Sequence, residues 1–300
     1  MKRAFLSLSG LALFCASGFA ANVAVVISND VPVYVQARDS FKKLLAAKGV
    51  SASFTDYNLK EKQISDIASQ VASQKPDVVF VLGNAALSGL KDKLGGIPVV
   101  FCMVYEQELS AGPNITGVTL DISPQAKLNE IRHILPGTKK IGMLYSDELS
   151  RIFDEYSSAA GRVGVAVSGQ KANSEGEMTE GFKKLTGEMD CFLIIPDKIY
   201  TLQMIKFILL ESLKNKIPVI GLSAMYTKAG ALASIDCNYD DIGRQAGEIA
   251  VRILNGEKPA GIKVERPRKV QFTLNSAVAQ KLETTVDPAL MKEASEVFGQ

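Results

Sequence analysis

An internal repeat constrains the fold of this 300-residue chain more than any other feature. Short apolar runs alternate with amphipathic helical stretches, and the same order recurs about 120 residues later, which is the self-similarity that marks a duplicated unit. Strands that alternate with helices in this way form parallel sheets covered by helices. The repeat therefore predicts an α/β fold with two similar Rossmann-like lobes. The matched runs are 22–28 with 140–146, 75–83 with 188–196, and 96–101 with 217–222.

The segment Asn215–Asp236 bears on how the lobes are joined. Its first apolar run, 217–222, is entered through Pro218, which suits the first residue of a strand buried on both faces. A polar turn with Tyr226 and Lys228 separates it from a second apolar run at 230–235. Two buried strands this close, without a long helix between them, predict that the chain crosses here from one lobe to the other.

Several short passages between the lobes, rather than one linker, are expected from the absence of any low-complexity segment. An extended segment at 114–120 and a polar connector at 257–267 are the other candidates. We therefore expect a multi-strand hinge. The predicted division is a signal peptide at 1–20, an N-terminal lobe of 21–118 plus 237–266, and a C-terminal lobe of 119–236 plus 267–300.

The amino terminus has the pattern of an export signal. A charged pair, Lys2 and Arg3, precedes an apolar stretch at 4–14, and small residues at 18 and 20 suit cleavage near Ala20. A retained anchor helix is the alternative, which the short apolar run disfavours. Lipidation at Cys15 is rejected because the bulky Phe14 precedes it. The expected location of the mature protein is the periplasm.

Composition narrows the partners. The chain carries 47% hydrophobic and 22% charged residues, and its formal net charge is +2. Loss of Lys2 and Arg3 brings the mature chain close to neutrality, which argues against nucleic acid or an anionic membrane as its partner. The three cysteines beyond the signal, at 102, 191 and 237, lie in or beside predicted strands, and we expect buried thiols rather than a disulfide.

Candidate binding residues follow the predicted strands, because ligands of parallel α/β sheets bind outside the carboxyl ends of the strands. Their hydroxyl, amide and carboxylate groups suit a small polar solute or a zwitterion. Helix capping is the alternative role for Asn84 and Ser146, and pairing with Lys198 the alternative for Asp197. Tyr226 and Asp236 are favoured because a crossing strand should border the cleft. The predicted ligand-binding set is Asn29, Asn84, Tyr105, Ser146, Asp147, Asp197, Tyr226 and Asp236, with Glu106 also considered.

Signals of an enzyme are nearly absent. His133 is the only histidine, which excludes multi-histidine metal sites, and it is interpreted as a solvated or helix-end residue. No nucleophile elbow, P-loop or glycine-rich dinucleotide motif is present. We expect no catalytic residue, no metal and no cofactor.

Six stretches, in order and spacing, resemble the substrate-binding proteins of ABC transporters that bind tryptophan or tyrosine and have a type I periplasmic-binding fold. They cover nearly the whole mature chain: 96–101 (GIPVVF), 114–122 (NITGVTLDI), 135–145 (LPGTKKIGMLY), 195–197 (IPD), 217–220 (IPVI) and 236–256 (DCNYDDIGRQAGEIAVRILNG). Relatives usually carry Thr-Pro where this chain has Asn84-Ala85, a Thr- and Asp-rich turn where it has 105–107, and Asn-Ser where it has 146–150.

The resemblance implies a two-lobed receptor that closes on its ligand and presents it to a permease in the inner membrane. We expect a monomer that binds an amino acid or a related small molecule by hinge closure. Two alternatives stay open at this point. One is an exported sensor that presents its liganded form to a membrane kinase or chemoreceptor, and the other is an exported α/β enzyme.

Overall fold

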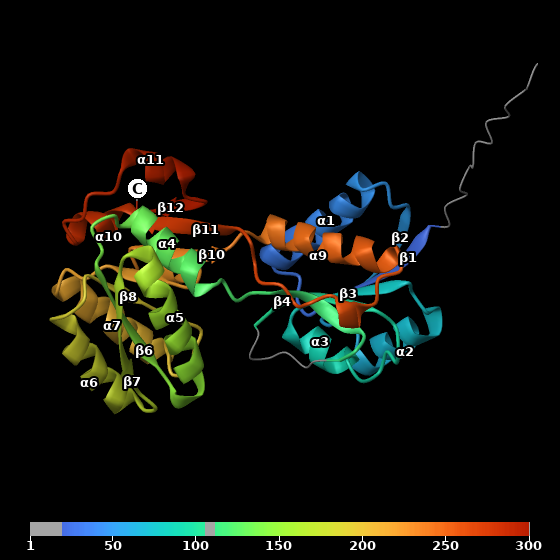
Figure 1. Ribbon diagram of the computed structural model, residues 1–300, viewed down its shortest axis with the longest axis horizontal. Coiled ribbons are helices and arrows are strands. Elements are labelled where there is room, and N and C mark those ends of the chain that lie inside the picture. The colour runs from blue at the N-terminus through green and yellow to red at the C-terminus, as the bar shows by residue number, and fades with distance from the viewer. Residues whose placement is uncertain (1–19, 106–111, 300) are drawn as a thin grey trace, which may run out of the picture.

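The structure is a computed structural model that describes residues 20–105 and 112–299. It consists of two lobes that lie side by side and are joined through a narrow waist (Figure 1). The predicted signal peptide and the candidate Glu106 fall outside the described residues.

The N-terminal lobe is built on a five-stranded parallel sheet with the strand order β2-β1-β3-β4-β5. Its central strands are apolar along their buried length, as expected for strands covered on both faces. The edge strand β2 is the polar exception. The strands are β1 (Ala21–Ile27), β2 (Ala52–Asn58), β3 (Val78–Leu82), β4 (Val99–Val104) and β5 (Ile115–Thr119).

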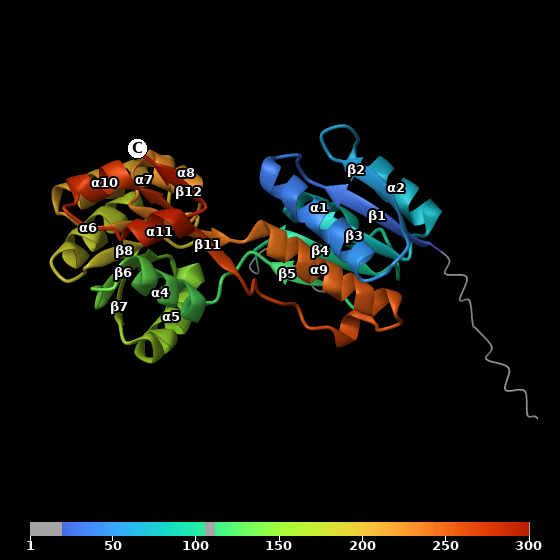
Figure 2. The ribbon, with the colours of Figure 1, turned by 90° about the horizontal axis from the view of Figure 1, so that it is seen from above.

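Alternation along the strands divides the core of this lobe into two layers. In β3, Phe80 faces α1, where it stacks on Phe41 with the ring centroids 3.9 Å apart. Its neighbours Val79 and Val81 belong to the opposite layer, with α2 and α3. Figure 2 shows α1 and α9 together on one side of the sheet. The helices are α1 (Pro32–Ala47), α2 (Ile64–Gln74), α3 (Asn84–Leu90) and α9 (Tyr239–Leu254).

The C-terminal lobe is built on a seven-stranded mixed sheet with the order β12-β11-β10-β9-β8-β6-β7. The strands from β10 to β7 are parallel, and β11 runs antiparallel to β10. The strands are β6 (Lys140–Tyr145), β7 (Ala166–Lys171), β8 (Cys191–Leu193), β9 (Val219–Gly221), β10 (Ala233–Cys237), β11 (Val270–Asn275) and β12 (Glu296–Phe298).

Helices cover both faces of this sheet as well. Gly169 of β7 lies against Phe153 of α5, whereas the next residue, Gln170, lies against Gly181 of α6, so α5 and α6 cover opposite faces. The helices are α4 (Pro124–Ile134), α5 (Ser150–Val163), α6 (Glu175–Thr186), α7 (Leu202–Lys214), α8 (Ala224–Ala229), α10 (Ser276–Lys281) and α11 (Pro288–Glu293).

The strands matched in sequence occupy matching places in the two sheets. The order β2-β1-β3-β4 in one lobe corresponds to β7-β6-β8-β9 in the other. The predicted α/β class with two similar lobes is therefore confirmed. The sheet memberships support the division into 21–118 plus 237–266 and 119–236 plus 267–300, which we retain as a proposal.

Local signals in the sequence explain where several helices begin. The side chain of Ser123 accepts a hydrogen bond from the backbone N–H of Ala126, and Pro124 occupies the first turn of α4. Asn275 and Asp287 cap α10 and α11 in the same way. These three predicted caps are confirmed. The three cysteines are buried free thiols, as predicted.

The prediction for 215–236 is wrong in one respect. The polar turn is the short helix α8, and the strands on either side of it, β9 and β10, are parallel neighbours in one sheet. The chain does not cross between the lobes there, because an apolar run of six residues after a short helix can pair in parallel within the same lobe. The crossing follows β10, where Cys237 leads into α9 of the N-terminal lobe.

Three segments pass between the lobes and are bonded to one another. The first leaves β5, the second leaves β10, and the third returns from α9 to β11. Glu265 of the third segment donates its N–H to the carbonyl of Gly117 and accepts the N–H of Thr119, both at the end of β5, where the first segment begins. Asn238 of the second donates to the carbonyl of Lys269 of the third. The expected multi-strand hinge thus has a physical counterpart in the waist.

The N-terminal lobe depends on a close crossing of α1 and α9. A Cβ atom added to Gly243 would lie 2.0 Å from the carbonyl oxygen of Ala37, far inside the contact distance. A glycine is therefore required for the two backbones to approach this closely. This helix crossing attaches α9, which follows β10 of the C-terminal lobe, to α1 of the N-terminal lobe.

We predict that Gly243→Ala lowers the free energy of unfolding by about 1–3 kcal/mol, the usual cost of overpacking a core. Gly161, a helical glycine of α5 with no atom near the added Cβ, supplies the matched control. Gly161→Ala should leave stability unchanged or raise it by up to about 1 kcal/mol. Urea unfolding followed by circular dichroism measures both, and equal effects would contradict the close-crossing argument.

Candidate functional site

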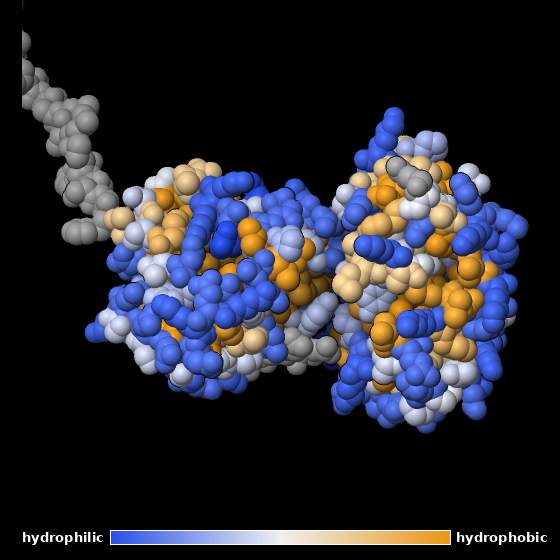
Figure 3. Space-filling view, turned by 180° about the vertical axis from the view of Figure 1, so that it is seen from behind, coloured by the Kyte–Doolittle hydropathy of each residue, from blue (hydrophilic) through white to orange (hydrophobic). Residues whose placement is uncertain are grey.

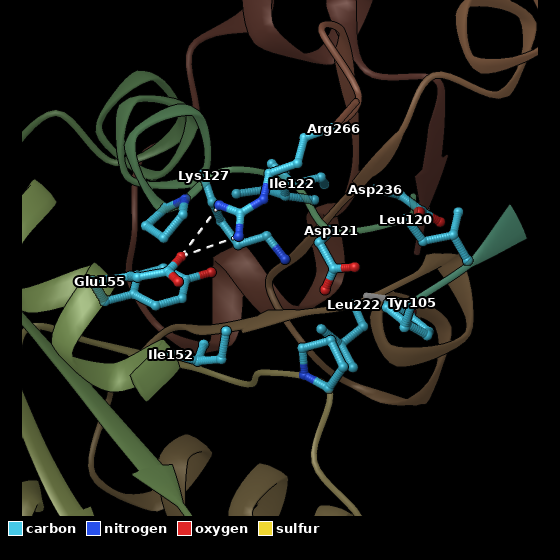
Figure 4. Close-up of a pocket in the computed structure, with 14 residues that line it drawn as sticks. Tyr105, Leu120, Asp121, Ile122, Lys127, Ile152, Glu155, Leu222, Asp236 and Arg266 are labelled. Carbon is cyan, nitrogen blue, oxygen red and sulfur yellow. Dashed lines mark hydrogen bonds and ion pairs between the residues drawn. The ribbon is translucent and has the colours of Figure 1, made fainter. Parts of the chain in front are cut away.

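A cavity lies between the lobes, where the carboxyl ends of both sets of parallel strands meet the waist. Figure 3 shows the groove between the lobes from the outside, and Figure 4 shows the lining side chains. The cavity measures about 40 Å³, which is space for a few water molecules. It is lined by Tyr105, Leu120, Asp121, Ile122, Pro124, Lys127, Ile152, Glu155, Tyr156, Pro196, Leu222, Ile235, Asp236 and Arg266.

The N-terminal lobe contributes Tyr105, which follows β4. The pairing of β4 with β5 shifts register between Phe101 and Val104, and Met103 within that bulge has a φ of 63°. A bulge with a left-handed residue bends a strand end and re-aims the side chains beyond it. Burial raises the pKa of Tyr105, and the nearby carboxylate of Asp236 adds to the shift. Tyr105 is therefore a neutral phenol at the mouth of the cavity.

Asp236 stands at the end of β10, where the chain leaves the C-terminal lobe. Its Oδ2 accepts a hydrogen bond from the Tyr239 hydroxyl at 2.5 Å, and its Oδ1 accepts one from the N–H of Cys237 at 2.7 Å. Burial raises the pKa of this carboxyl, while the two hydrogen bonds and the ammonium of Lys127 oppose the rise. The site thus presents a partly desolvated carboxylate.

Four charged residues of the cavity, Asp121, Lys127, Glu155 and Arg266, were missed by the sequence argument. Lys127 lies in α4 on the face that carries the buried Leu128 and Ile131, so the available signal was a lysine in an apolar helix stripe. Arg266 in the returning segment pairs with Glu155 of α5, with both terminal guanidinium nitrogens, Nη1 and Nη2, 3.2 Å from Glu155 Oε2. Their separation of more than 100 residues left no local signal for that pair.

Of the eight predicted residues, Tyr105 and Asp236 line the cavity. Tyr226 lies in α8, half-buried above Gly221. Asn29 accepts a hydrogen bond from the N–H of Asp30, and Asn84 accepts one from the Ser88 hydroxyl within α3. None of these three lines the cavity, although Tyr226 is near enough to Tyr105 to act on it electrostatically.

The remaining three, Ser146, Asp147 and Asp197, lie together at the carboxyl ends of β6 and β8. Asp197 accepts the N–H groups of Ser146 at 2.7 Å and of Ile199 at 3.2 Å, so it ties the two strand ends together. Asp147 is exposed and pairs with Lys171 at 2.7 Å. The alternative partner considered for Asp197, Lys198, instead contacts Glu148. The Ser146 hydroxyl is buried and has no hydrogen-bond partner among the described residues.

A larger depression of about 1000 Å³ lies at the opposite end of the N-terminal lobe, beside Ala21, Gly96 and Gly256. It borders the amino ends of the strands, where parallel α/β sheets do not place their ligands. The small cavity at the waist is therefore the candidate site. His133 does not line this cavity. It lies exposed in the last turn of α4, with its Nε2 2.8 Å from Oε2 of Glu293.

The comparisons with known proteins show the family and the fold of the chain. Residues 20–298 match the family of ABC transporter substrate-binding proteins, so the chain belongs to that family. The match spans nearly the whole chain and both lobes.

The relatives share the whole architecture. A tyrosine-binding protein of Clostridioides difficile (strain R20291) is 22% identical over 279 residues, which is 87% of this chain and 81% of that protein. A substrate-binding protein with adhesive properties from Clostridium difficile, in its ligand-free open form, matches with a TM-score of 0.75, covering 93% of this chain and all of the other at 22% identity. A protein from Streptococcus pneumonia in complex with L-Trp matches with a TM-score of 0.60 at the same identity and coverage.

The fold is therefore of the type I periplasmic-binding class, as the matched chains include a periplasmic ribose transporter component at a TM-score of 0.53. Within the part of the chain that the structure describes, none of the helices combines the length and apolar character needed to cross a membrane. Among the same residues, no group of three His, Cys, Asp or Glu side chains is placed to hold a metal ion.

We predict that Asp197→Ala destabilises the ligand-free protein by about 2 kcal/mol, because two backbone N–H groups lose a charged acceptor. Asp147→Ala is the matched control, since its exposed ion pair contributes little to stability. Differential scanning calorimetry should show a lowered unfolding temperature for the first variant alone. Equal unfolding temperatures for both variants would contradict the tie between β6 and β8.

We predict that Asp236→Asn is at least as stable as the wild type at pH 7 in the absence of ligand. The pKa of Asp236 is raised in the folded state, so its charged form costs stability that is recovered as the pH falls towards the ordinary value of 3.8. The difference in unfolding free energy between variant and wild type should therefore shrink from pH 7 to pH 4. Urea titrations over that pH range measure this difference. A difference that grows on acidification would contradict the raised pKa of Asp236.

Proposed function

We propose that the protein is the periplasmic receptor of an ABC uptake transporter, which binds a small polar ligand, an amino acid or a close relative, by closing its lobes around it. The observation that carries the proposal is a cavity at the waist to which both lobes contribute, Tyr105 from one and Asp236 from the other. Because these two residues belong to different lobes, movement of the lobes towards each other would enclose a ligand that lies between them. The bonded hinge segments offer an axis for that movement.

The relatives support the ligand class. One of them is named for tyrosine and another was solved with L-Trp. The cavity of this chain combines tyrosine rings with carboxylates and a lysine, which suits a small zwitterion. Asn29, Asn84, Ser146, Asp147, Asp197 and Tyr226 remain proposed members of the site, reached by the ligand only when the lobes close.

The proposed setting follows from the family. The mature protein, cleaved near Ala20, would act as a monomer in the periplasm and deliver its ligand to a permease in the inner membrane. Such a receptor performs no covalent chemistry: it works by the difference in ligand affinity between its open and closed states. A closed, liganded form is what the permease would recognise.

We predict that at least one of the twenty L-amino acids raises the unfolding temperature and reduces the radius of gyration measured by small-angle X-ray scattering. Asp236→Ala and Tyr105→Ala should each lower the affinity for that amino acid by about tenfold or more, because each variant loses a charged or buried contact with it. Glu180→Ala, at an exposed position of α6, is the control and should bind as the wild type does. Binding without compaction would rule out hinge closure.

A further inference from the structure

A buried lysine faces the cavity from the C-terminal lobe. Lys127 lies in the first half of α4, and only 5% of its surface is exposed. Its side chain points from the helix towards the centre of the cavity, on the side of Asp121 (Figure 4). Lysine is almost never buried to this extent unless it is paired.

Within residues 20–105 and 112–299, the ammonium of Lys127 has no direct partner. Its Nζ takes part in no hydrogen bond there and lies within 4.0 Å of no carboxylate. Burial accordingly lowers its pKa, and the more distant charges of Asp236 and Asp121 and the thiol of Cys237 only oppose that shift. A desolvated ammonium without hydrogen bonds costs stability.

The other cation of the cavity is already committed. Arg266 holds Glu155 through both terminal nitrogens. Outside the cavity, Arg268 is likewise paired, with Asp241 and Glu248. Lys127 differs from both arginines because it is more deeply buried and, among the described residues, has no carboxylate in contact. An anionic group brought in from outside would complete its coordination.

We propose that Lys127 receives the carboxylate of the bound ligand, and that its charge is what makes the receptor select free amino acids over amines and amides. This inference rests on the proposed function and adds the group that reads the acidic end of the ligand. The cavity then holds opposite charges on its two sides, Lys127 for the carboxylate and Asp236 for the ammonium. That arrangement matches a zwitterion and penalises a ligand with only one of the two charges.

A structural role is the rival explanation. Lys127 could serve only to offset the carboxylates of Asp236 and Asp121 across the cavity. In that case, removing the ammonium would destabilise the empty protein and would weaken every ligand equally. A binding role predicts a selective loss instead, together with an empty protein that is no less stable. The two explanations therefore differ in measurable ways.

The experiment compares each of the twenty L-amino acids with its C-terminal amide by isothermal titration calorimetry. Lys127→Met replaces the ammonium by an apolar group of similar length, and Lys127→Arg retains the charge. Lys206→Met, at an exposed position of α7, controls for the substitution itself. The wild type should prefer at least one acid over its amide by about 10- to 100-fold, the range for a charge-assisted hydrogen bond.

Lys127→Met should abolish this preference by lowering the affinity for the free amino acid and leaving the affinity for the amide unchanged. Lys127→Arg should retain part of the preference, and Lys206→Met should retain all of it. A preference that survives in Lys127→Met, or an equal loss for acid and amide, would overturn the assignment of Lys127 while leaving the receptor function standing. A wild type that binds none of the amino acids would overturn the proposed ligand class, and this inference with it.

Discussion

Backbone hydrogen bonds among the three crossing segments are the constraint on which the rest of the structure depends. Glu265 is bonded through both its N–H and its carbonyl to the end of β5, so an isolated parallel bridge joins the third passage to the strand from which the first departs. The second passage joins it through Asn238 and through the Cys237 thiol, which lies 3.4 Å from the Leu120 carbonyl. Each lobe is completed by a segment that passes through this waist: α9 joins the N-terminal lobe, and β11 joins the C-terminal lobe.

The lobes could be predicted from the sequence because their signals are local and repeated. Apolar runs such as 78–82 and 99–104 are buried along their whole length, and a strand of that kind leaves an unbroken apolar pattern in the sequence. The caps at Ser123 and Asn275 are likewise signals within a few residues. The error at 215–236 arose because spacing shows that two strands are close in the chain but does not show which partner each will pair with.

The site was predicted less completely, for a related reason. Tyr105 and Asp236 were found because they follow strands whose carboxyl ends meet at one edge. Lys127 and Glu155 come from helices, and Arg266 comes from an irregular connector, so the rule for strand ends does not reach them. Asn84 and Ser146 do follow strands, yet Asn84 is bonded within its own helix and Ser146 is bonded to Asp197 at the end of β8. Which strand ends face the cavity depends on the orientation of the lobes, and local patterns do not encode that orientation.

In the proposed receptor, the charges of the cavity would link ligand binding to closure. Burial disfavours the charged forms of both Asp236 and Lys127, so it raises the pKa of the first and lowers that of the second. The ligand-free protein therefore bears a cost that falls when complementary charges arrive, since a buried charge is tolerated when it is paired and hydrogen-bonded. Closure without a ligand would desolvate these groups further and raise that cost. A zwitterion removes it at both ends, so the closed state should be populated only when the guest is present.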